Sequence, residues 1–100
     1  MKEEKGYKVD KKVMIDFIKK SVEEVEGVFS IKKGLWGRKI RFKESNEGIE
    51  VFLGLVIRRG NSVPQVVEEI QRKLIREIEE TFGISVKKVD VQIKGIESPK

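Results

Sequence analysis

The 100-residue sequence predicts an α+β fold, a two-layer sandwich in the order α-β-β-α-β. One observation is the helical spacing of apolar residues in segments 11–26 and 63–81. The other is an alternation of polar and apolar residues, typical of strands, in segments 39–43, 49–57 and 86–94. Because each helix has one apolar stripe, both helices are expected to cover the same face of a three-stranded mixed sheet.

The first helix is predicted from Lys11 to Glu26. Asp10 suits the N-cap, and Gly27 suits the left-handed position after the last turn. Its inward stripe consists of Val13, Met14, Phe17, Ile18, Val22 and Val25. The preceding Tyr7–Val9 segment is a candidate extra edge strand at the N-terminus.

The segment 28–38 after this helix reads as a loop, and it contains the single tryptophan, Trp36. The next strand is followed by Ser-Asn-Glu-Gly at 45–48, which are turn residues suited to a hairpin. In strand 49–57 one face carries five aliphatic side chains. The other face carries Phe52, Gly54 and Val56.

The stretch RRGNSVPQVV at 58–67 joins this strand to the second helix. Ser62 and Gln65 fit a capping box, and Pro64 fits the first turn. A phosphate-binding loop is the alternative, but the stretch lacks the Lys-Ser or Lys-Thr ending, and proline removes a donor. We therefore favour a structural joint. Arg58 and Arg59 stay candidate binding residues because they lie at a strand end beside a helix N-terminus.

The second helix is predicted from Val63 to Thr81, ending at Gly83, with Glu69 paired to Lys73 on its outer face. A right-handed crossover through this helix makes the last strand parallel to the second. We favour the strand order 2-1-3, which places 40–42 in the centre of the sheet. Residues 95–100 are expected to form a tail.

Composition removes most catalytic chemistry. The chain has no cysteine and no histidine, so disulfides, thiol nucleophiles and imidazole bases are excluded. No acid pair, nucleophile or metal cluster stands out, so we expect no enzyme activity, no cofactor and no metal site. The net charge of +5 favours anionic partners.

The sequence shows no long apolar run or signal peptide, so we expect a single cytoplasmic domain spanning 1–100, ordered over about 7–96, with no direct membrane insertion. Abundant Lys, Glu and Ile is typical of a thermophilic source.

The helix-free sheet face is the most informative surface. By alternation it carries Lys39, Arg41, Lys43, Phe52, Val56, Lys88, Asp90, Gln92 and Lys94. One reading is a solvated face with two stray apolar residues. The other is a docking or self-association surface with an apolar centre and a basic rim.

Two further readings concern the loop. Gly34-Leu35-Trp36-Gly37 matches the GXXG pattern of KH RNA-binding domains, but a strand follows where that domain has a helix. Trp36 either covers the end of the core or contacts a partner.

The chain resembles the alkaline shock protein family of envelope stress response proteins, mostly from Gram-positive bacteria. The match covers about 7–96, and its carrying segments are Glu24–Val28, Gly60 with Ser62–Val66, Thr81–Ile84 and Val89–Ile96. The resemblance implies a small non-enzymatic α+β module that supports envelope homeostasis. Some members are held at the membrane by a small membrane-anchored partner and form assemblies. In this chain the loop after the first helix is compact, and the termini lack the extended charged segments of many members.

From these observations we expect a protein-interaction module, either self-associating or held at the inner side of the cell membrane by a partner. Nucleic-acid binding through the basic sheet face is the alternative. The candidate partner-binding residues are Phe52, Val56, Trp36, Lys39, Arg41, Arg58 and Arg59.

Overall fold

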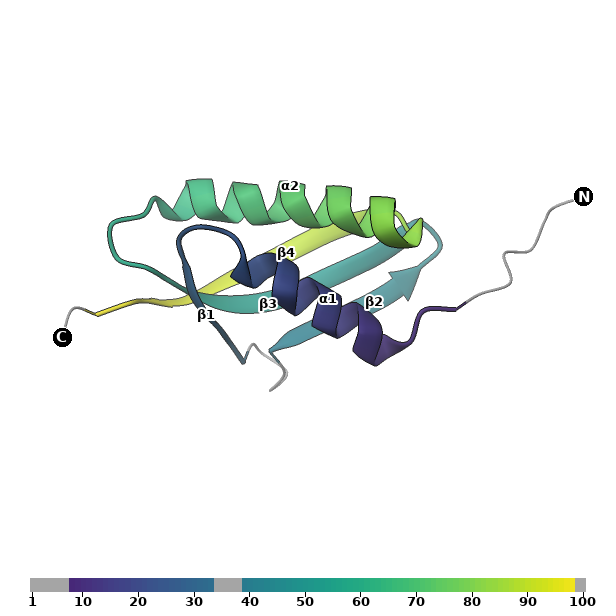
Figure 1. Ribbon diagram of the computed structural model, residues 1–100, viewed down its shortest axis with the longest axis horizontal. Coiled ribbons are helices and arrows are strands. Elements are labelled where there is room, and N and C mark those ends of the chain that lie inside the picture. The colour runs from purple at the N-terminus through teal and green to yellow at the C-terminus, as the bar shows by residue number, and fades with distance from the viewer. Residues whose placement is uncertain (1–7, 34–38, 99–100) are drawn as a thin grey trace, which may run out of the picture.

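The structure, a computed structural model, describes residues 8–33 and 39–98 and is an α+β fold (Figure 1). Two helices and four strands follow one another along the chain. They are α1 (Lys11–Glu23), β1 (Val28–Lys32), β2 (Ile40–Ser45), β3 (Gly48–Ile57), α2 (Val63–Phe82) and β4 (Val86–Ile96). The predicted fold class is confirmed, but the sheet has one strand more than predicted.

The signals at the helix ends act as predicted at three of four positions. Asp10 caps α1 by accepting from the Lys12 backbone N–H at 2.9 Å. Ser62 caps α2 by accepting from the Gln65 backbone N–H, and Gly83 ends that helix with φ 70°. Helix α1 ends at Glu23, three residues earlier than predicted. The chain then turns toward β1, so the predicted end at Glu26 was wrong.

The sheet is mixed, and β3 is its central strand. β1 and β2 both pair antiparallel with β3, β1 with its second half and β2 with its first half, while β4 pairs with β3 in parallel. The parallel relation of the last two strands is confirmed. The order 2-1-3 was wrong, because 40–42 lies in an edge strand. β3 has the longest apolar run of the sheet, and it is the strand whose two edges are both hydrogen-bonded to neighbours.

β1 occupies a segment that the sequence predicts as loop. Val28 and Ile31 are buried and pair with Ile57 and Leu55. A register shift between Val28 and Ser30 disturbs the simple alternation. At the other end β4 includes residues 95 and 96, predicted as tail, and the Glu97 N–H still donates to the Ile57 carbonyl at 2.8 Å. Residues 8 and 9 form no strand, and Tyr7 lies outside the described residues.

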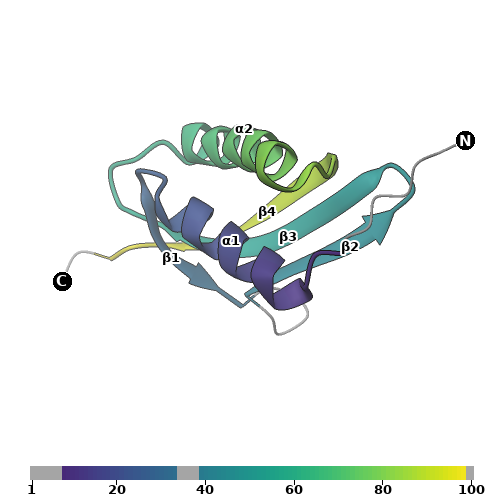
Figure 2. The same cartoon turned by 45° about the vertical axis from the view of Figure 1, so that its right-hand side comes forward.

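Both helices lie on the same face of the sheet, as predicted, and together they cover the core (Figures 1 and 2). The five aliphatic residues of β3 are at most 4% exposed. They pack beneath fully buried residues of both helices, including Ile18, Val22, Ile70, Leu74 and Ile78. The placement of Val13 on the inward stripe was wrong, because its side chain is 51% exposed.

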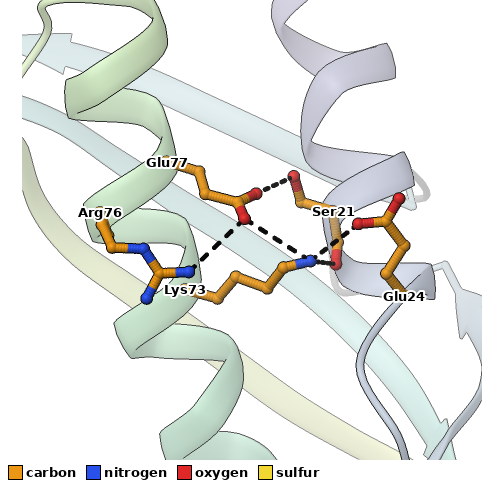
Figure 3. A network of polar contacts seen from close by, with 5 residues as sticks. All are labelled: Ser21, Glu24, Lys73, Arg76 and Glu77. Carbon is orange, nitrogen blue, oxygen red and sulfur yellow. Dashed lines mark hydrogen bonds and ion pairs between the residues drawn. The ribbon is translucent and has the colours of Figure 1, made fainter.

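A polar network joins α1 to α2 above the core (Figure 3). The Lys73 ammonium donates to the Ser21 carbonyl at 2.9 Å and contacts Glu24 at 3.0 Å. The Ser21 hydroxyl donates to Glu77 Oε1 at 2.9 Å. The predicted partner of Lys73 on its own helix, Glu69, was therefore wrong, because the lysine turns inward to the other helix.

Candidate interaction surface on the open sheet face

The face of the sheet opposite the helices carries a mixture of cations and apolar side chains. Its cross-strand neighbours follow from the strand register: Arg41 lies opposite Phe52, Lys43 opposite Glu50, and Ser30 opposite Val56. On the other side of β3, Asp90 is in register with Phe52. Both helices of the described chain lie on the other side of the sheet. We call this surface the open face.

Phe52 lies between two cations. The Arg41 guanidinium carbon is 5.0 Å from the centroid of its ring, and the Lys88 ammonium is 5.5 Å from it. A cation at this distance is attracted to the ring by about 0.5–1 kcal/mol at an exposed site. Phe52 is only half-buried. The ring is therefore held in place while part of it stays accessible.

Val56 lies between two shallow hollows. One, of about 730 Å³, has Phe29, Arg59 and Ile96 among its lining residues. The other, of about 620 Å³, is lined by Ser30, Ile31, Lys32, Lys33, Lys39, Val56 and Lys94. Lys32 and Val56 line both, so the two hollows adjoin at the end of the sheet where β1 pairs with β3.

The structure brings the predicted site residues into two groups. Arg41 joins Phe52, whereas Lys39 and Arg59 join Val56. Phe52 and Val56 are four residues apart on one strand, a separation of roughly 13 Å.

Arg58 makes contacts of its own beside the second group. It lies 5.4 Å from the centroid of the Phe29 ring, and one of its guanidinium nitrogens is 4.0 Å from Glu97. Trp36 and the 34–37 glycine pattern lie outside the described residues, so the reading of that loop stays a prediction.

Two exposed apolar residues of this surface were not predicted. Phe29 is 48% exposed and Ile96 is 45% exposed, and both line the larger of the two hollows, that of about 730 Å³. The sequence does not indicate them, because it predicts a loop over 28–38 and a tail over 95–100. The Val-Phe-Ser-Ile-Lys run at 28–32 is rich in strand-forming residues and was the available signal for Phe29.

The acidic groups of this surface are partly engaged. Glu50 lies 3.4 Å from the Lys87 ammonium, and Glu97 contacts Arg58. Within residues 8–33 and 39–98, no cluster of three potential metal-ligating side chains occurs. In the same part of the chain, no helix is long and apolar enough to cross a membrane. What remains is a surface with a positive character.

The sequence matches the model of the alkaline shock protein 23 family, described as having a cell envelope-related function, over residues 1–98. The chain belongs to this family. The match spans both helices and all four strands, so it includes every element that builds the open face. The resemblance inferred from short motifs is thereby confirmed.

Solved structures with a similar fold include several forms of the MamM CTD. A double variant is 18% identical, with a TM-score of 0.63, and the alignment covers 86% of this chain and 99% of that chain. A copper form is 17% identical with a TM-score of 0.64, covering 86% and 98%. At such identity the likeness shows the fold alone. No curated protein matches the sequence significantly.

Proposed function

We propose that this family member is a non-enzymatic interaction module whose open face docks an acidic protein surface. The observation that carries the proposal is the pairing of accessible apolar side chains with cations on a face that the described helices leave uncovered. The cell envelope-related description of the family supports a role at the inner side of the cell membrane, reached through this partner.

The chemistry of the surface sets the chemistry of the partner. Apolar anchors at Phe29, Phe52 and Val56 favour a partner that buries aromatic or aliphatic groups against them. The surrounding lysines and arginines favour acidic residues at the rim of that contact. Face-to-face pairing of two copies would oppose lysines to lysines, so a partner of opposite charge is preferred for this face.

Replacing Phe52 by lysine, and separately Val56 by lysine, tests the proposal. Each change removes an apolar anchor and adds a positive charge. Docking of an acidic protein with apolar anchors should weaken by at least about tenfold, the scale of a lost central contact. The readout is the amount of each co-purifying protein, compared quantitatively between wild type and variants that have been shown to fold by circular dichroism.

Val13 and Ile75 supply matched controls on the helix side. They are 51% and 38% exposed, so Val13→Lys and Ile75→Lys make the same chemical change away from the open face. The same proteins should co-purify with these two variants as with wild type. The proposed docking surface would be overturned if the co-purifying proteins were lost with Val13→Lys and Ile75→Lys but retained with Phe52→Lys and Val56→Lys.

Nucleic-acid binding, the competing reading of the positive surface, predicts the opposite response. Binding to a polyanion depends on phosphate contacts, so an added lysine should preserve or strengthen it, and rising salt should weaken it steeply. Binding that is strengthened by Phe52→Lys and lost as salt rises would therefore replace the proposed function with this alternative.

A further inference from the structure

We propose that the lysine-lined hollow beside Val56 is a binding site for a soluble anion carrying two or more phosphoryl groups. The hollow has a volume of about 620 Å³ and lies at the end of the open face, where β1 meets β3. The assignment goes beyond the docking function, because the site would bind its ligand in the absence of any protein partner.

Among the described residues, the lining of this hollow includes four lysines and no acid. Within the described part of the chain, none of Lys32, Lys33, Lys39 and Lys94 makes an ion pair. Elsewhere, Lys12, Lys19, Lys73 and Lys87 each contact a carboxylate, whereas Lys11 and Lys20 contact none in segments 8–33 and 39–98. The four lysines of the hollow differ from Lys11 and Lys20 because they line one concavity together. Gathering unpaired like charges around one concavity raises the free energy of the unliganded protein, and an anion in the hollow offsets that cost.

A buried hydroxyl supplies a second, independent observation. Ser30 lines the same hollow, and its Oγ is buried with no hydrogen-bond partner among the described residues. A buried hydroxyl normally has a partner, and one without a protein partner points to a water or an ion. With a change of rotamer, Ser30 would donate to a phosphoryl oxygen between the lysines.

The position of Lys94 is defined by the backbone beneath it. Gly54 has no side chain, and the Lys94 stem occupies the space above it: a Cβ at position 54 would lie 3.1 Å from Lys94 Cγ. Lys32 pairs with the same glycine from β1. Lys32 and Lys94 therefore flank the same glycine from opposite neighbouring strands.

The number and arrangement of the charges indicate the ligand class. Lysine binds phosphate as a compact point charge. Four lysines match the charge of a diphosphate or longer group better than that of a single phosphate. The open face does not continue as an unbroken basic stripe, because Glu50 and Asp90 lie farther along it, near Phe52. A compact anion therefore fits this hollow better than an extended nucleic-acid backbone.

The test is a titration of the isolated chain with pyrophosphate, followed by calorimetry and by amide NMR shifts. Wild type should bind, with the shifts concentrated at Ser30, Lys32, Val56 and Lys94. The Lys32→Gln/Lys94→Gln variant should bind at least about tenfold more weakly. Inorganic phosphate should bind more weakly than pyrophosphate, and added salt should weaken both.

Lys11→Gln/Lys20→Gln removes the same charge from α1, where neither lysine makes an ion pair among the described residues. This control should bind pyrophosphate as wild type does. If both double variants bound pyrophosphate equally weakly, the attraction would be to net charge alone and the site would be overturned. NMR shifts spread evenly over the chain, or no binding at low salt, would overturn it as well. Loss of the site would leave the Phe52 and Val56 docking test unaffected, since that test measures protein capture.

Discussion

A pair of glycine substitutions tests the placement of β4 beside β3. Gly48 and Gly60 both have positive φ, 126° and 93°, so alanine at either position costs about 1–2 kcal/mol in backbone strain. Their surroundings differ. A Cβ at Gly60 meets no atom within 4 Å, whereas a Cβ at Gly48 would lie 2.5 Å from the Ser85 carbonyl oxygen.

Relief of that overlap at Gly48 requires the start of β4 to move away. The movement would break the 2.9 Å hydrogen bond from the Ile49 N–H to the Ser85 carbonyl, worth about 1 kcal/mol. Adding the backbone strain and the lost hydrogen bond, we expect Gly48→Ala to lower the free energy of unfolding by about 2–3 kcal/mol, and Gly60→Ala by about 1–2 kcal/mol.

Denaturant unfolding measures both variants against wild type, and melting provides a check. About 1 kcal/mol corresponds to a fall in Tm of roughly 4–8 °C in a domain of this size. Equal destabilisation by the two substitutions would refute the reasoning, because it would mean that the Ser85 backbone, just before β4, does not abut Gly48.

Two further predictions concern the helix layer. Lys73→Met should lower the free energy of unfolding by about 1–2 kcal/mol, because it leaves the Ser21 carbonyl without its 2.9 Å donor. Lys19→Met removes an exposed ion pair and should change the free energy of unfolding by less than about 0.5 kcal/mol. Equal losses for the two variants in urea titrations would contradict the role of the inter-helix network. Ile70→Ala should lower the free energy of unfolding by about 2–5 kcal/mol because the side chain is fully buried. Ile75→Ala, at a position 38% exposed, should lower it by less than about 1 kcal/mol. A lower melting temperature for Ile75→Ala than for Ile70→Ala would show that α2 presents another face to the sheet.

Local chemistry made the second helix and the hairpin predictable. The cap at Ser62, the stop at Gly83 and the turn before Gly48 each act through neighbours in sequence, and the structure confirms all three. The end of α1 was not predictable in this way. Val25 is 7% exposed and continues the apolar spacing, although it lies in the turn beyond the helix. Burial alone therefore does not show whether a residue is helical.

Strand order depends on contacts between distant segments, and the sequence carries little local information about it. β3 is apolar on both faces, at Phe52 and Val56 as well as in the core, and this two-sided pattern favours a central strand. The exposed end of β2 favours an edge. The open face was predictable from alternation, whereas the hollows beside Val56 depend on β1, whose irregular register concealed it.

Photo-crosslinking from the open face tests the central claim most directly. A photoreactive phenylalanine analogue is placed at Phe52, and in a second protein at Ile75 on the outer side of α2. The account predicts a discrete crosslink to one acidic protein from position 52 and none to that protein from position 75. Crosslinks to that protein from position 75 alone would contradict it.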